Sequence, residues 1–157
     1  MIALHCDGSL KLDKGYYGGI IRDNKGEPIL AYAGIGHFAS VLHMELLAIF
    51  RGITLCIEKN FTKVSIKLDS KLVVDMLNGV IQGPWDTQVI KRRILQLTKY
   101  FALIEFKHVW RELNRPADYM ASLELPSEEI LIMPTRFPND LKVFVEEDAA
   151  HMVYYRV

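Results

Sequence analysis

The chain has 157 residues, of which 50% are apolar and 24% are charged. This composition excludes intrinsic disorder, and the length suits one domain with a sizeable core rather than two. Nineteen basic and nineteen acidic residues give a formal net charge of zero, so any contact with nucleic acid must be made by a local patch rather than by the field of the whole molecule.

Three consecutive strands are predicted at the start of the chain. Residues 2–7 alternate between apolar and polar side chains and end on an aspartate, which is typical of a strand. Residues 16–23 and 28–36 are apolar and contain several glycines. The link from Asp23 to Gly26 between them has the composition of a hairpin turn.

A change of period then predicts helices that alternate with strands. From Val41 to Lys59, apolar residues recur at helical spacing on most of the circumference, which indicates a central buried helix. The later elements are predicted as a strand over 64–69, a helix over 70–77, a helix over 86–101 capped by Asp86, a strand over 103–110 and a short helix over 114–123. With the two successive helices over 70–77 and 86–101 taken as one helical unit, the order is βββαβαβα, an α/β arrangement.

The end of the chain differs in composition. The change begins after Pro126, and Pro134 and Pro138 interrupt the pattern further on. Residues 125–157 are therefore predicted to be a C-terminal extension of unknown role, with one strand over 141–145.

No segment has the length or the pattern of a membrane span or a secretion signal. The longest apolar run, 41–50, is interrupted by His43 and Glu45 and is too short for a bilayer. Cys6 and Cys56 lack the spacing of a metal or redox motif. We expect an intracellular protein of a reducing compartment, the nucleus or the cytoplasm, with no membrane partner.

Glu45 is the most informative residue of the sequence. Residues three and four apart share a helix face, so Glu45 lies with Val41, Ala48 and Gly52, which are small or apolar. A carboxylate on such an inward face is costly unless its pKa shifts, it pairs with a cation or it binds a metal. A salt bridge to a lysine or arginine of a neighbouring strand is the ordinary alternative.

Three aspartates have positions that complement Glu45. Asp7 and Asp69 each end a predicted strand, and a strand-helix-strand crossover favours parallel neighbours, whose ends lie side by side. Asp118 lies in the first turn of the last helix. Taken singly, Asp7 is explained by a turn, Asp69 by a helix N-cap and Asp118 by the helix dipole. Taken with Glu45, four hard oxygen donors at one point describe a site for Mg²⁺ or Mn²⁺.

The sequence resembles the type 1 ribonuclease H family, and more narrowly the ribonuclease H-like domains of plant genes and plant non-LTR retroelements. The matching stretches follow the family order: Asp7-Gly8-Ser9, residues 18–23 with Gly26, Glu45 in its apolar helix, Asp69-Ser70 followed by Val73-Val74, and residues 108–112 continuing through Asn114 to Ala117-Asp118. The resemblance implies a ribonuclease H-like domain over residues 1–124, with a five-stranded mixed sheet flanked by helices. It also implies that Asp7, Glu45, Asp69 and Asp118 bind metal.

The function that the resemblance implies is a metal-dependent endonuclease. Such an enzyme hydrolyses the RNA strand of RNA·DNA hybrids and leaves 5′-phosphate and 3′-hydroxyl ends. Two Mg²⁺ ions roughly 4 Å apart activate the attacking water and neutralise the leaving oxygen, and Mn²⁺ is an expected substitute. Gly8, Ser9, Ser70 and Asn114 are the family-like positions for gripping the nucleic-acid backbone and the 2′-hydroxyls.

The sequence departs from the family pattern in two places. Many ribonucleases H carry a histidine in a mobile loop before the last aspartate, but residues 111–116 leave little room for that loop. His108 is expected to lie within a strand, bonded to a backbone partner. The basic insertion that holds the hybrid in some members is also missing, and Lys91 and Arg92 offer a smaller substitute. We expect slow catalysis and weak, salt-sensitive binding.

Two other functions fit the same residues. One is a catalytically weak or inactive module that keeps the ribonuclease H fold and binds nucleic acid or protein, which the neutral charge and the missing loop histidine favour. The other is a related nuclease, such as a DEDD-type 3′ to 5′ exonuclease or a junction resolvase. The three leading strands and the place of Asp118 after the fifth strand favour ribonuclease H over the exonuclease. A monomer is expected.

Overall fold

The computed structural model describes residues 1–37, 40–125 and 128–156, with side chains up to residue 148. It contains one sheet with the strand order β5-β4-β1-β2-β3-β6. The strands are β1 (Ile2–Lys11), β2 (Lys14–Arg22), β3 (Pro28–Gly36), β4 (Lys63–Leu68), β5 (Leu103–His108) and β6 (Ile130–Ile132). Because β1 pairs with β2 in antiparallel fashion and with β4 in parallel fashion, the sheet is mixed, as expected.

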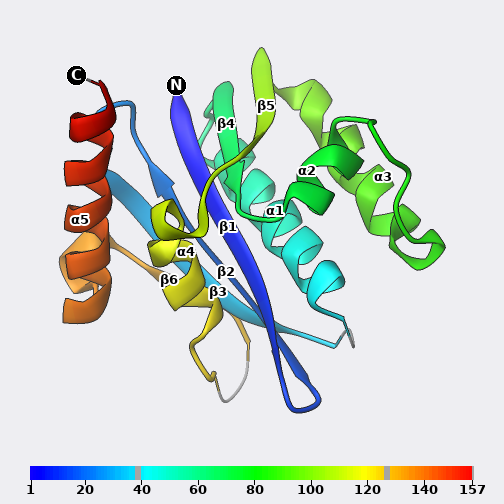
Figure 1. Ribbon diagram of the computed structural model, residues 1–157, viewed down its shortest axis with the longest axis horizontal. Coiled ribbons are helices and arrows are strands. Elements are labelled where there is room, and N and C mark those ends of the chain that lie inside the picture. The colour runs from blue at the N-terminus through cyan, green and yellow to red at the C-terminus, as the bar shows by residue number, and fades with distance from the viewer. Residues whose placement is uncertain (38–39, 126–127, 157) are drawn as a thin grey trace.

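The helices cover both faces of the sheet (Figure 1). Those on one side are α1 (Val41–Glu58), α2 (Lys71–Leu77) and α3 (Gln88–Leu97), and those on the other are α4 (Arg115–Ala121) and α5 (Asn139–Arg156). None of the described helices combines the length and the apolar character that crossing a membrane demands.

Each face of the sheet has its own hydrophobic core. The larger core lies under α1, where the predicted apolar stripe of that helix meets buried strand residues such as Leu4 and Ile66. The smaller core lies under α4 and α5 and includes Ile20, Met120 and Leu141. Burial of apolar surface on both faces fixes the sheet between two helical layers, which is the α/β arrangement predicted from the sequence.

The structure has six strands where five were predicted, because the C-terminal extension contributes one. β6 pairs antiparallel with β3 through three residues, Ala31 to Ala33. A strand this short, followed closely by Pro134, leaves too little alternation to be recognised in a sequence. Pro126, where the composition changes, lies outside the described residues.

The strand predicted over 141–145 is wrong, since these residues belong to α5. Leu141 and Val145 are buried and Val143 is 48% exposed. A spacing of four fits both the period of a strand and that of a helix, so this short apolar pattern could not distinguish them.

Among the predicted boundaries that differ from the structure, two concern a residue given a role in the sequence analysis. β1 continues past Asp7 to Lys11, because β2 pairs with it along its whole length. Asp7 therefore lies within a strand and not in a turn. Asp86 does not cap α3; it lies in a 3₁₀ turn (Trp85–Thr87) that precedes the helix.

Candidate metal centre

The parallel pairing of β1 and β4 places Asp7 next to Asp69. The register runs from Ile2 opposite Val64 to His5 opposite Lys67, and each aspartate lies two residues beyond that last pair. Since parallel strands keep the same direction, the two carboxylates reach the same end of the ladder. Ser70, and not Asp69, is the N-cap of α2, so the capping explanation of Asp69 is wrong.

Gly8 allows α1 to bring Glu45 to this point. A Cβ at position 8 would overlap backbone atoms of Met44 and Glu45, so the helix and the strand are in direct backbone contact here. Asp7, Glu45 and Asp69 each offer an oxygen atom, and these atoms all lie within 4.8 Å of one another.

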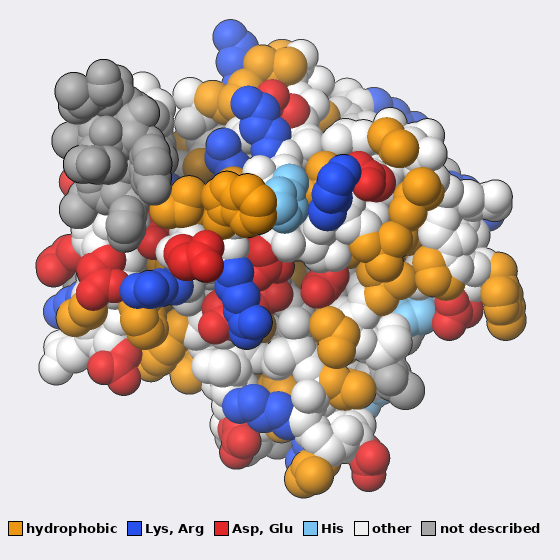
Figure 2. All heavy atoms as spheres, in the orientation of Figure 1, with side chains coloured by type: hydrophobic (Ala, Val, Ile, Leu, Met, Phe, Trp, Pro, Cys, Tyr) orange, Lys and Arg blue, Asp and Glu red, His pale blue; other side chains and the backbone are white. Residues whose placement is uncertain are grey.

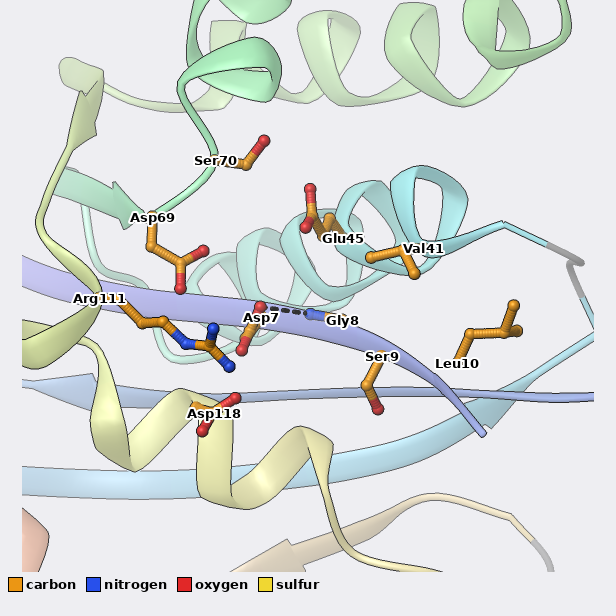
Figure 3. Close-up of a pocket in the computed structure, with 10 residues that line it drawn as sticks. All are labelled: Asp7, Gly8, Ser9, Leu10, Val41, Glu45, Asp69, Ser70, Arg111 and Asp118. Carbon is orange, nitrogen blue, oxygen red and sulfur yellow. Dashed lines mark hydrogen bonds between the residues drawn. The ribbon is translucent and has the colours of Figure 1, made fainter. Parts of the chain in front are cut away.

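Glu45 has no ion pair with a lysine or arginine in the part of the chain that the structure describes. Its carboxylate points instead toward Ser70 (Figure 3), and a hydrogen bond from the Ser70 side chain opposes the rise in the pKa of Glu45. The ordinary alternative for a buried glutamate, a salt bridge to a neighbouring strand, is therefore not what the structure contains.

Asp118 approaches from the opposite face of the sheet. Gly18 pairs with Asp7, and a Cβ on Gly18 would overlap backbone atoms of α4, so that helix also packs directly on the sheet. The Ser9 hydroxyl donates to the carbonyl oxygen of Ala121 at 2.6 Å and holds α4 in place. Asp118 lines the same cleft as the other three carboxylates and contacts Asp7, although it stands outside the group that meets within 4.8 Å.

The four carboxylates line an open cleft of about 490 Å³. Figure 2 shows acidic side chains gathered near the middle of this face, with basic side chains close by. Arg111 also lines the cleft, and its guanidinium points toward Asp7 and Asp118 (Figure 3). A role for Arg111 was not predicted from the sequence, where its sole signal is its place between the fifth strand and the last aspartate.

The carboxylates raise one another's pKa because they are crowded and partly buried. Burial, then the charge of Asp69 and the contact with Asp118, raise the pKa of Asp7 to about 8. Burial and the charge of Asp69 raise the pKa of Glu45 to about 7. Burial also raises the pKa of Asp69, while Asn114 and Arg111 oppose that shift. Clustered hard oxygen donors that resist ionisation fit a divalent cation.

This electrostatic arrangement predicts a pH-dependent stabilisation by metal. Folding raises the pKa of Asp7 and Glu45 to about 8 and about 7, so between about pH 4 and 8 the folded chain retains protons that the unfolded chain has released. Without metal, these two groups therefore lower the free energy of unfolding as the pH rises. We expect Mg²⁺ to stabilise the protein more at pH 8 than at pH 5 in urea titrations with and without EDTA. An equal gain at both pH values, or the same difference in an Asp7→Asn control, would contradict this account.

Five of the six predicted nucleic-acid-binding residues fall into two places. Gly8, Ser9 and Ser70 line the cleft. Two of the hydroxyls already have hydrogen-bond partners: that of Ser9 donates to the backbone of α4, and that of Ser70 accepts from the backbone of α2. Lys91 and Arg92 lie on α3 and are not among the residues that line the cleft. The Lys91 ammonium donates to the carbonyl oxygen of Gln82 at 3.0 Å, while Arg92 is exposed. Their contacts with substrate remain predictions.

Asn114 and His108 both lie close to the carboxylates but outside the cleft lining. Asn114 is fully buried and begins α4. Its side-chain amide bonds to groups inside the protein, so it is not exposed for the predicted contact with a 2′-hydroxyl.

His108 lies at the end of β5, with Nε2 3.2 Å from the backbone oxygen of Asp69. The His108 ring therefore has a backbone hydrogen-bond partner, as expected from the sequence. Its ring also meets Trp110 edge to face at 5.5 Å.

Comparisons with known proteins bear on the fold of residues 5–124. A family model described as "Reverse transcriptase-like" matches these residues. Among solved structures, RNase H1 from Halobacterium salinarum is similar with a TM-score of 0.73 and 20% identity, covering 76% of this chain and 92% of that chain. The N-terminal RNase H domain of a Mycobacterium tuberculosis protein gives a TM-score of 0.72 and 20% identity, with 76% and 89% covered.

A third similar structure holds a nucleic acid. LC11-RNase H1, solved in complex with an RNA/DNA hybrid, gives a TM-score of 0.69 and 22% identity, covering 76% of this chain and 93% of that chain. At these identities the likeness establishes the fold alone. A comparison with curated protein sequences found no match.

Proposed function

Because this chain belongs to the reverse transcriptase-like family and its fold is similar to that of RNase H1 proteins, we propose that it is a metal-dependent endonuclease acting on the RNA strand of RNA·DNA hybrids. The observation that carries the proposal is the meeting of Asp7, Glu45 and Asp69 within 4.8 Å. The hybrid bound to the similar LC11-RNase H1 supports the choice of substrate. The products are 5′-phosphate and 3′-hydroxyl ends.

The residues of the cleft have different roles in the proposed reaction. Asp7, Glu45 and Asp69, with Asp118 beside them, would hold the divalent cations. Bound Mg²⁺ or Mn²⁺ supplies Lewis acidity and lowers the pKa of an attacking water. The Arg111 guanidinium offers a phosphate oxygen a charged hydrogen-bond donor at the same cleft. The cleft is open and rimmed by polar groups, which suits the backbone of a duplex rather than an enclosed small molecule.

Proton delivery to the leaving oxygen falls to water in this proposal. The described residues that line the cleft include no histidine, and the His108 ring is engaged with the backbone of Asp69. A general acid contributes about 10²–10⁴-fold to such a step. Slow turnover is therefore expected relative to an enzyme that positions a histidine there.

The test compares three labelled substrates: RNA·DNA hybrid, double-stranded RNA and single-stranded DNA. We expect cleavage of the hybrid alone, in its RNA strand, with Mg²⁺ or Mn²⁺ present and none with EDTA. End analysis should give 5′-phosphates. Folded protein that is inactive on all three substrates would overturn the proposal and favour an interaction module that retains the fold.

A further inference from the structure

A hydrogen-bonded network that the proposed chemistry does not use lies beneath the carboxylates. His5 Nδ1 is 3.2 Å from Asn114 Oδ1, and Asn114 Nδ2 donates to the carbonyl oxygen of Cys6 at 3.0 Å. His5 is 6% exposed and Asn114 is completely buried. The two side chains are 109 positions apart in the sequence, so the contact is a product of the tertiary fold.

The chemistry of the partners fixes the protonation of His5. A carbonyl oxygen accepts hydrogen bonds and never donates, so Cys6 requires the NH₂ group of the Asn114 amide on its side. The amide oxygen then faces His5, and it too can only accept. His5 must therefore carry its proton on Nδ1. Nε2 is buried without a hydrogen-bond partner among the described residues, which is consistent with a neutral ring whose second nitrogen has no proton to place.

Asn114 is linked to the segments that carry three of the four carboxylates. Its side chain holds Cys6, the neighbour of Asp7, and hydrogen-bonds to the carboxylate of Asp69. Its backbone oxygen accepts from the amide of Asp118 at 3.0 Å. A flipped amide would direct an oxygen at the Cys6 carbonyl and at the Asp69 carboxylate, and both contacts would become repulsive.

We propose that His5 is a positioning residue of the metal centre, because its Nδ1–H holds the Asn114 amide in the one orientation that fixes the spacing of Asp7, Asp69 and Asp118. The inference rests on the metal-binding part of the proposed function and adds a residue outside the cleft. His5 touches neither substrate nor metal. It acts through Asn114, as a residue behind a metal ligand commonly does.

The test measures Mn²⁺ affinity in the absence of substrate, by electron paramagnetic resonance of the free ion, for the full chain and three variants. His5→Leu removes the donor and is expected to weaken Mn²⁺ binding about tenfold, the lower end of what such partners contribute. His5→Asn places an amide N–H where Nδ1–H stood, and should stay within about twofold of the original affinity. His5→Gln places its amide nearer the position of Nε2 and serves as the matched control that does not restore binding.

The outcomes separate this inference from the proposed function. Folded His5→Leu with unchanged Mn²⁺ affinity, or folded His5→Asn that loses as much affinity as His5→Leu, overturns the positioning role even if the protein cleaves hybrids. Normal Mn²⁺ binding with the graded variant effects, but no cleavage, supports the positioning role and overturns the nuclease. Should His5→Leu fail to fold, nitrogen-15 NMR of the unmodified protein decides: a proton on Nδ1 is expected, and a proton on Nε2 overturns the inference.

Discussion

Asp69→Asn is expected to lower the rate of hybrid cleavage by about a thousandfold or more, because a bound metal supplies several kcal/mol of transition-state stabilisation and each 1.4 kcal/mol is about tenfold in rate. The fold should be retained. The variant also removes a charge that raises the pKa of both Asp7 and Glu45, so the protein without metal should become more stable. We expect its Tm in EDTA to rise by about 2–4 °C, corresponding to roughly 1 kcal/mol.

The combination of the two effects is the informative part of this experiment. Neutralising a carboxylate that stabilises the fold lowers the stability of the protein. Neutralising a carboxylate that is held close to other carboxylates for a cation raises the stability of the protein without metal. Asp13→Asn, in the exposed turn between β1 and β2, is the matched control and should change neither quantity. Retained cleavage in Asp69→Asn, or a fall in its Tm with EDTA, would argue against the metal centre.

The second large effect is expected at the buried ion pair between β2 and α5. Asp148→Asn should lower the free energy of unfolding by about 3 kcal/mol, because removing one partner leaves a buried charge without compensation. The Arg22 guanidinium lies 3.5 Å from Asp148, and the two side chains are 1% and 3% exposed. Arg22 also donates to the carbonyl oxygens of Gly26 and Val145, so it cannot turn away to reach water.

An exposed ion pair one residue away provides the control. Glu147 pairs with Arg115 at 3.0 Å, but both side chains are nearly half exposed. Glu147→Gln should cost at most about 0.5 kcal/mol, as is usual for surface pairs. Urea titrations in Mg²⁺ compare the two variants, and a loss in Asp148→Asn no larger than that in Glu147→Gln would refute the importance of the buried pair.

The sequence was sufficient for those features that follow from local periodicity and chain order. The nine strands and α-helices up to residue 121 occur in the predicted order, and the neighbouring positions of Asp7 and Asp69 follow from the rule that a crossover joins parallel strands. Glu45 was recognisable because a charge interrupts an otherwise apolar helix face. Each of these signals is contained in a short window or in the order of the elements.

The features that escaped sequence reasoning depend on contacts between distant segments. Asn114 is both a helix-start residue, as its type suggests, and the buried partner of His5, which no local pattern indicates. The position of Arg111 over the carboxylates depends on the path of a loop. β6 is recognised as a strand solely by its pairing with β3. In such cases the tertiary environment decides what the residue type leaves open.

The short strand β6 has a consequence for how molecules of this chain meet one another. Without it, β3 would be a nine-residue outer strand with unpaired backbone groups along its middle, a template on which a second molecule can add a strand. β6 occupies that template and replaces it with a three-residue border close to Pro134, which offers a neighbour little to pair with. Through β6, the C-terminal segment therefore opposes aggregation by strand addition at the β3 edge of the sheet.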